Sequence, residues 1–296
     1  MRIYILQKKM VFSTISNDMR IREMNERLKE LVTKNSDFKF ILIDDKNKEV
    51  PAHMLKIASN SLELTTMIYG LDSKMTPLTE IKVDGISSDD FIEIVRYMYE
   101  DYANINENNV YNVLTKSTYF GIKGLEKNCI EFISKNLNVS NIFVAYTFFC
   151  THHGYYDIKL FCEKSIQSYG TKAFSTNGFL EIPLHILREI LKFHTIKCPE
   201  KDVFKFTLLW AANQCALQKI VPSAANKRKV LNGAEKLVRY CTLPLCEFRE
   251  CLNVDKEFFS PDEIQSIEKE INENTYSFNQ RLFYDIIGKL NSVKKN

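Results

Sequence analysis

Hydrophobic and polar positions follow two different periods in the first half of the chain. Between residues 19 and 34, apolar residues recur every three or four positions, which predicts an amphipathic helix. The run DFKFILID at residues 37–44 instead has apolar residues at alternate positions and predicts a strand. The polar run at residues 44–49 then predicts a hairpin turn that leads back to Val50.

Other elements of the first half are marked by signals at their ends. A proline at the start predicts a helix over residues 51–59, and Gly70 predicts the end of a second helix over residues 62–69. Residues 80–83 are expected to form a short strand. Ser87 predicts the N-cap of the next helix, with an aspartate three positions later. Two more amphipathic helices are predicted over residues 108–120 and 125–136.

Strand patterns disappear after Val139, and the remaining sequence predicts one helix after another. The predicted helices cover residues 142–150, 158–169, 174–179, 183–192, 203–217 and 261–272. The last one has a complete start signal in Ser260, Pro261 and Glu263. Trp210, the single tryptophan, is expected to anchor a core, and residues 278–290 carry a further apolar stripe. The predicted fold class is therefore α+β, with an all-α second half.

Composition narrows the class of protein. The 296 residues are 45% hydrophobic and 26% charged, which predicts a soluble chain long enough for two domains. A net charge of +3 gives no sign of a nucleic-acid or membrane-surface partner. The eight cysteines lack the dense spacing of a disulfide framework, and no apolar run is long enough for a signal peptide or a membrane span. We therefore expect reduced thiols and a cytoplasmic location, with the nucleus as the alternative.

Motifs for the common enzyme chemistries are missing. The sequence has no glycine-rich phosphate loop, no HExxH, no GxSxG and no paired CxxC. We therefore predict no catalytic residue, no cofactor and no enzyme activity. Cys150, His152, His153 and Cys162 would form a zinc site if two helices met at Gly154, but a helix end with buried thiols is the favoured interpretation.

Three other features have structural interpretations. Cys241, Cys246 and Cys251 recur every five residues and would point in different directions on a helix, so we assign them to packing. The basic run at residues 226–229 is interpreted as solvated, with nuclear import or a phosphate contact as the alternative. His53 is expected to be a partly buried histidine with satisfied hydrogen bonds.

Several motifs, taken together and in order, resemble the BTB (POZ) domain. They are Ser36-Asp37-Phe38-Lys39-Phe40, the run from Val50 to Ser61, Met67-Ile68-Tyr69-Gly70, the run from Ile94 to Tyr99, and the run from Tyr119 to Leu125. In that family a strand, an Ala-His helix and a Tyr-Gly helix end follow one another at similar separations. The resemblance implies a BTB domain over residues 19–136, after an N-terminal extension over residues 1–18.

The helical half is similar to the BACK domain that follows BTB domains. The similarity rests on Asn141-Ile142-Phe143, Gly178-Phe179, the run from Leu187 to Leu191, and the run from Glu200 to Ala212. It implies a BACK domain over residues 137–272 and a tail over residues 273–296. The most similar subgroup is the BTB-BACK-PHR type, and the tail is too short for a PHR sandwich or kelch repeats. We therefore expect the substrate-reading domain of that subgroup to be missing.

The resemblance implies a homodimeric adaptor that binds cullin-3 in a ubiquitin ligase and presents a substrate protein. In the family the first helix packs across the dimer axis, which implies a dimer interface at Ile21, Met24, Leu28 and Leu31. The cullin-facing surface of the family corresponds here to Tyr69, Leu71, Met75, Leu78 and Tyr102.

One segment departs from the family pattern. Strong cullin-3 binders carry a hydrophobic-x-Glu motif soon after the Tyr-Gly position, where this chain has Leu71-Asp72-Ser73. Leu78-Thr79-Glu80 matches the hydrophobic-x-Glu motif, but Glu80 belongs to a predicted strand. The departure predicts weak or absent cullin-3 binding. It leaves open a dimeric scaffold without ligase activity, which would form mixed dimers with longer BTB relatives.

Overall fold

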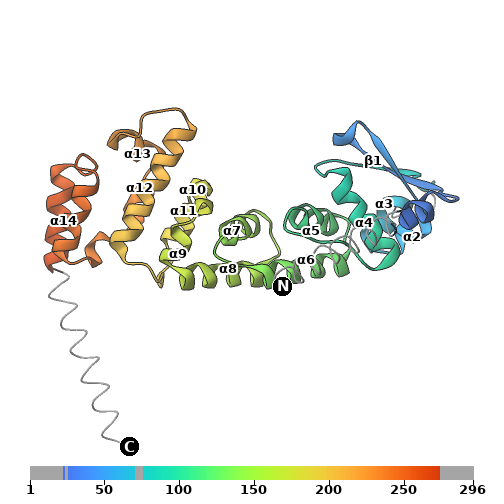
Figure 1. Cartoon of the computed structure of the whole chain (residues 1–296), viewed down its shortest axis with the longest axis horizontal. Coiled ribbons are helices and arrows are strands. Elements are labelled where there is room, and N and C mark those ends of the chain that lie inside the picture. Colours follow the sequence, from blue (N-terminus) through green and yellow to red (C-terminus); the bar gives the residue numbers. More distant parts are fainter. Residues whose placement is uncertain (1–22, 24–25, 71–75, 274–296) are drawn as a thin grey trace, which may run out of the picture. The chain divides into compact units, whose positions relative to one another are not determined.

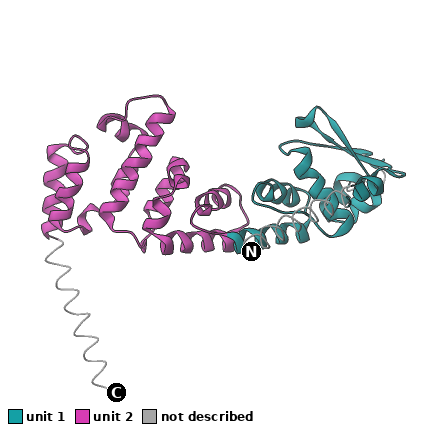
Figure 2. Ribbon diagram, viewed as in Figure 1, with its two compact units in different colours: residues 1–136 teal, residues 137–296 magenta. Residues whose placement is uncertain are grey.

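The computed structural model describes residues 23, 26–70 and 76–273. Its contacts divide the chain into two compact units, residues 1–136 and residues 137–296 (Figure 2). The first unit combines helices with a small sheet, and the second is helical (Figure 1). This confirms the predicted α+β class. The extension at residues 1–18 and the apolar stripe at residues 278–290 lie outside the described residues.

A three-stranded mixed sheet belongs to the first unit. β1 (Phe38–Leu42) and β2 (Lys48–Ala52) pair antiparallel across the short helix η1 (Ile43–Asp45), which confirms the predicted hairpin. β3 (Glu80–Val83) pairs parallel with β1, so the strand order is β2-β1-β3. Alternate residues of β1 are buried on one face, as the apolar alternation predicted.

The helix predicted over residues 51–59 begins later than expected. Pro51 lies in β2 opposite Lys39, and α2 covers only Met54–Ala58. The strand pattern continues through the proline, because Val50 and Ala52 are buried while Pro51 is partly exposed. β2 is an edge strand, where a residue without an N–H group is tolerated. The prediction was wrong because it gave the helix preference of proline more weight than the alternation around it.

Helices make up the rest of the first unit. They cover residues 26–33, α2, α3 (Leu62–Tyr69), α4 (Ser88–Glu100), α5 (Val110–Tyr119) and α6 (Lys123–Asn136). Ser87 caps α4 by accepting a hydrogen bond from the Asp90 N–H group, as predicted. The fully buried Phe40 of β1 packs edge-to-face against Phe91 of α4 at 5.0 Å between ring centroids. This aromatic contact joins the sheet to α4.

The second unit is built from helices and short helical turns. They are α7 (Ile142–Thr151), α8 (Tyr156–Tyr169), α9 (Thr171–Phe174), α10 (Asn177–Glu181), α11 (Leu184–Leu191), α12 (Glu200–Leu217), α13 (Ala224–Leu231), η2 (Ala234–Leu237), η3 (Tyr240–Thr242), α14 (Leu245–Val254) and residues 261–273. Trp210 of α12 is 2% exposed, and its indole N–H donates to the Ile182 carbonyl at 2.9 Å. The tryptophan therefore anchors the core of this unit, as predicted.

Charged pairs fasten the last helices of the second unit. The Arg228 guanidinium on α13 donates two hydrogen bonds of 2.6 Å to the Glu263 carboxylate. Glu263 also accepts from the Ser260 N–H group while Ser260 caps residues 261–273, which confirms the predicted start signal. Lys227 pairs with Asp255 at 3.0 Å. Two of the three cations in the run 226–229 are therefore held in ion pairs and are not simply solvated.

The cysteines are free thiols in several environments. None of the eight, all of which lie among the described residues, forms a disulfide. Cys251 is buried, as the packing assignment requires, but Cys246 is exposed, so for that residue the assignment was wrong.

Within the described ranges, no helix combines the length and the apolar character that crossing a bilayer requires.

Candidate functional site

A histidine joins three elements of the first unit. The Nε2 atom of His53 lies 2.8 Å from the Lys34 carbonyl, at the end of helix 26–33. Its Nδ1 atom lies 2.7 Å from the Tyr99 hydroxyl on α4, which also accepts the His53 N–H group at 2.8 Å. A carbonyl can only accept, so we infer that Nε2 carries the proton and that Tyr99 donates to Nδ1. Burial raises the pKa of Tyr99, so the hydroxyl stays neutral.

Large apolar side chains are exposed close in sequence to both partners of the His53–Lys34 bond. Leu31 on helix 26–33 is 43% exposed, and Leu55 at the start of α2 is 76% exposed. Both residues lie within a few positions of the Lys34–His53 bond. The family resemblance implied Leu31 as a dimer-interface residue, whereas sequence reasoning missed Leu55, because position 55 was read only as part of a helix. Scattered exposed apolar residues are common, but two close to one hydrogen bond that joins two elements mark a candidate interface.

The predicted dimer residues are placed in different surroundings. Leu28 is 3% exposed and is covered within its own unit, whereas Leu31 faces outward. Ile21 and Met24 lie outside the described residues. The stripe of four therefore does not lie on a single exposed face, since Leu28 is already buried within the unit.

Two of the predicted partner-binding residues lie near one another. Tyr69 is half-buried at the end of α3, where Gly70 ends the helix with a φ of 73°. The N–H group of Leu78 donates to the Ile68 carbonyl at 2.8 Å, so Leu78 is held beside the end of α3, and its side chain is 51% exposed. Leu71 and Met75 lie outside the described residues. Glu80 opens β3, as predicted.

Polar side chains hold the segment that carries Tyr102. Tyr102 is 48% exposed and follows Asp101, which ends α4 in the left-handed conformation. The carboxylate of Glu93 accepts from the Asn104 N–H group at 2.7 Å, and the buried Asn109 side chain donates to the Asn104 carbonyl at 2.9 Å. Burial raises the pKa of Glu93 although the Asn104 N–H group opposes that shift. The two bonds hold the segment, and Tyr102 with it, in one position.

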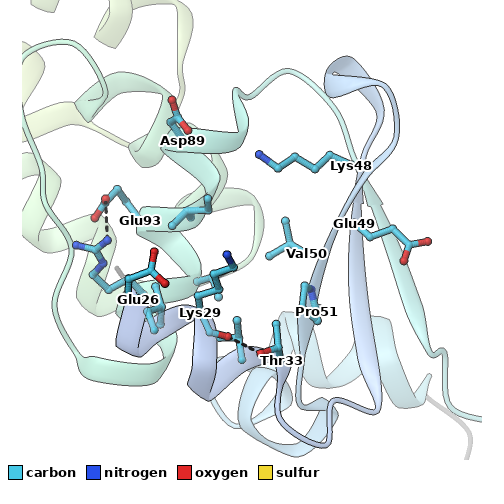
Figure 3. A pocket seen from close by; sticks show the side chains of 14 residues that line it. Glu26, Lys29, Thr33, Lys48, Glu49, Val50, Pro51, Asp89 and Glu93 are labelled. Carbon is cyan, nitrogen blue, oxygen red and sulfur yellow. Dashed lines mark hydrogen bonds and ion pairs between the residues drawn. The ribbon is translucent and has the colours of Figure 1, made fainter. Parts of the chain in front are cut away.

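A groove of about 560 Å³ lies between helix 26–33, β2 and α4 (Figure 3). Its apolar lining comes from Leu28, Val32, Val50, Pro51, Ile92 and Val95. Charged side chains stand around it, among them Glu26 and Lys29 from the helix, Lys48 and Glu49 from β2, and Asp89 and Glu93 from α4. Sequence reasoning missed this groove, because its three walls are far apart along the chain.

The residues weighed for metal binding do not come together as a site. Cys162 is buried on α8, Cys150 is partly buried on α7, and the His152 ring stacks on Phe148 at 4.0 Å between centroids. In the part of the chain that the structure describes, no group of three or more His, Cys, Asp or Glu side chains is placed to hold a metal ion.

Comparison with known proteins identifies the first unit. The BTB/POZ domain model matches residues 28–137. The BTB/POZ domain-containing protein 6-B of Danio rerio is 31% identical over 202 residues, which cover 68% of this chain and 41% of the relative. The BTB/POZ domain-containing protein 3 of Homo sapiens is 27% identical over 201 residues, 68% of this chain and 38% of the relative.

These matches extend beyond the domain itself. The aligned 202 residues exceed the 110 residues between positions 28 and 137, so the similarity continues outside this range. The chain spans about two fifths of the length of the relatives it matches. Residues 28–137 contain the sheet, the His53 bonds, Tyr69, Leu78 and Tyr102 described above. This chain therefore contains a BTB/POZ domain, at residues 28–137.

Proposed function

We propose that the protein is a dimeric adaptor that binds other proteins and catalyses no reaction itself. The observation that carries the proposal is the pair of exposed leucines, Leu31 and Leu55, close in sequence to the two partners of the His53–Lys34 bond. An isologous interface places the same patch of both copies together, so each leucine would be covered by the partner. Ile21, Met24 and Leu28 would extend the interface along the first helix, with the buried Leu28 supporting it from within.

The finer proposal is that the domain binds cullin-3 and serves as a substrate adaptor of a ubiquitin ligase. Tyr69 and Leu78 would form one part of the contact, Tyr102 another, and Leu71 and Met75 the segment between them. Aromatic and large apolar residues that are held rigidly are typical hot spots of interfaces. The bonds from Glu93 and Asn109 supply that rigidity for the Tyr102 segment.

The helical second unit supports the adaptor proposal as a BACK-like domain over residues 137–272. Its helices begin directly after the BTB/POZ domain, and the similarity to the relatives continues past that domain. We propose that it serves as a spacer or as a site for the substrate protein. The identity of the substrate is left open by the proposal.

A binding measurement with a matched pair of tyrosine variants tests the cullin-3 proposal. The purified chain is titrated with the N-terminal region of cullin-3 by calorimetry. Tyr102→Ala should weaken binding by about 1–4 kcal/mol, the range of an interface hot spot. The control is Tyr119→Ala on α5, which removes another exposed aromatic, outside the proposed surface. Equal losses for both variants, or no binding by the unmodified chain, would reject the cullin-3 contact.

A second candidate is a dimeric scaffold without ligase activity. It is favoured by the position of Glu80, which lies in β3 and pairs with Lys39 of β1. Because Glu80 is held in the sheet, Leu78-Thr79-Glu80 is not available as the hydrophobic-x-Glu motif of cullin-3 binders. In this case the chain would form mixed dimers with longer BTB relatives and fail to bind cullin-3. Co-expression with a longer relative distinguishes the two candidates, because only the scaffold captures the relative while cullin-3 stays unbound.

A further inference from the structure

The strand β3 lies at one edge of the sheet, and β1 is its only neighbour among the described strands. The Lys39 N–H group donates to the Thr79 carbonyl at 3.0 Å, and Lys39 lies opposite Glu80 in the parallel register. In this register the N–H and carbonyl groups of Glu80 and Lys82 point away from β1. None of these outward groups is hydrogen-bonded to another described residue.

The side chains along this edge alternate in character. Glu80 and Lys82 are exposed on one face of the sheet, and Ile81 between them is partly exposed on the other. Lys39 lies 3.8 Å from Glu80 but only 2.6 Å from Glu49, so Glu80 has the weaker of the two contacts. Lys82 has no ion-pair partner among the described residues. The edge therefore presents a negative and a positive charge, both available to an added strand.

The three residues are complementary to a second copy of themselves. In an antiparallel pair with Ile81 opposite Ile81 of the second copy, Glu80 lies opposite Lys82 of that copy, and Lys82 opposite its Glu80. The outward backbone groups of both copies then exchange hydrogen bonds within these two pairs. Both pairs join opposite charges on one face, and the isoleucines meet on the other. Charge usually protects an edge strand from pairing, whereas the charges of this edge match one another.

We propose that the outer edge of β3 is a contact between two copies of this chain, formed by this antiparallel pairing. The contact is short, because the next outward N–H group, that of Leu78, already donates to the Ile68 carbonyl at 2.8 Å. A contact of this size is weak, with a dissociation constant on the order of 1 mM.

The β3 contact is separate from the proposed leucine interface. Helix 26–33, which carries Leu31, forms the groove with β2, and β2 is the opposite edge of the sheet from β3. A mass measurement far below the expected dissociation constant therefore registers only the leucine interface. The full chain with Leu31→Asp and Leu55→Asp isolates the β3 contact, and it does so whether or not the leucines form a dimer.

Zero-length cross-linking of the full chain tests the pairing directly. Isotopically labelled and unlabelled chains are mixed at about 1 mM, the expected dissociation constant, and treated with a carbodiimide, which joins amines to carboxylates in direct contact. We expect a cross-link between Lys82 of one isotope and Glu80 of the other. Lys39 and Glu49, which lie 2.6 Å apart in one copy, provide the internal reference, because their cross-links should contain a single isotope.

Charge reversal tests the register. In the chain with Leu31→Asp and Leu55→Asp, adding either Glu80→Lys or Lys82→Glu should weaken self-association about tenfold, since both cross-strand pairs become like-charged. An equimolar mixture of these two variants should associate again, because every lysine then faces a glutamate of the other variant. Light scattering gives the average mass in each case. The control is Lys127→Glu, at an exposed position on α6, which should leave self-association unchanged.

The mixture also separates loss of the contact from loss of the fold, since two misfolded variants would not restore each other. A Lys82–Glu80 cross-link that never joins the two isotopes would overturn the proposal. So would single variants that associate as well as the chain without the charge reversal, or a mixture that associates no better than either variant alone.

Discussion

The two units of the chain use different polar interactions to hold their helices and loops in place. In the BTB/POZ unit, single polar side chains fix the ends of short elements, as His53 does for helix 26–33 and Glu93 for the segment after α4. In the helical unit, ion pairs such as the one between Arg228 and Glu263 join whole helices. Replacing one of these polar residues in the first unit should therefore disturb a binding surface, whereas replacing one in the second unit should mainly change stability.

The largest effect is expected in the core of the BTB/POZ unit. Phe40→Ala removes a ring that is fully buried between β1 and α4, and should lower the free energy of unfolding by about 3–5 kcal/mol. Denaturant unfolding measures the loss, and hydrogen exchange should locate it in β1 to β3. Phe161→Ala on α8, where the ring is 45% exposed, is the control and should cost much less. Similar losses for both would contradict the described core.

His53→Ala should have the next largest effect. It leaves the part-buried Tyr99 hydroxyl without its ring partner and exposes the Lys34 carbonyl to water, at a cost of about 1–2 kcal/mol. Faster hydrogen exchange is expected in residues 26–34 before any other segment. His185→Ala, at an exposed position on α11, provides the control. An unchanged exchange rate in residues 26–34 would show that the histidine does not hold the helix.

Glu263→Gln should destabilise the helical unit by about 1 kcal/mol, because the pair with Arg228 is bidentate but about one third exposed and is screened by solvent. The hydrogen bonds from Arg228 lower the pKa of Glu263 from 4.5 to about 2. Since the folded-state pKa is the lower one, the stabilisation is complete above pH 4.5 and is lost as the pH falls towards 2.

Melting curves across that pH range check this prediction. The difference in stability between the Glu263→Gln variant and the original chain should shrink as the pH falls from 5 to about 2. Glu257→Gln, at an exposed position close in sequence, is the matched control. A difference that stays constant with pH would contradict the ion pair.

The smallest effect on the free energy of unfolding is expected from a substitution at Tyr240, which should raise stability where the other substitutions lower it. Its hydroxyl is buried and has no hydrogen-bond partner among the described residues, and burial raises its pKa well above the usual value. Tyr240→Phe should therefore stabilise the helical unit by up to about 1 kcal/mol, because it removes an unsatisfied polar group. Tyr156→Phe, where the ring is 74% exposed, should change nothing. A loss of stability in Tyr240→Phe would reveal a hydrogen bond to that hydroxyl.

Local sequence signals predicted most of the fold. Ser87, Gly70 and Ser260 marked element ends that the structure confirms, because a cap depends on residues close in sequence. The prediction at Pro51 was wrong because its strand forms through pairing with β1. The local conformational preference of proline carries no information about that pairing. Contacts between distant residues were not predictable in the same way.

The candidate site was predicted less completely than the fold. The motif around His53 led to the BTB/POZ assignment, but its bonds to Lys34 and Tyr99 join positions 19 and 46 residues away. Leu55 and the groove depend on how three elements pack, and no spacing in the sequence marks them. The ion pairs of the run 226–229 depend likewise on residues 28 and 35 positions further along.

The molecular mass in solution tests most directly the claim that the BTB/POZ unit presents a self-complementary surface. Sedimentation equilibrium of the full chain at tens of micromolar should give twice the 34.6 kDa of one chain. Leu31→Asp with Leu55→Asp should give the monomer mass, while Leu209→Asp with Leu217→Asp on α12 should leave the dimer intact. A monomeric original chain, or a dimer that survives the first pair of substitutions, would contradict the account.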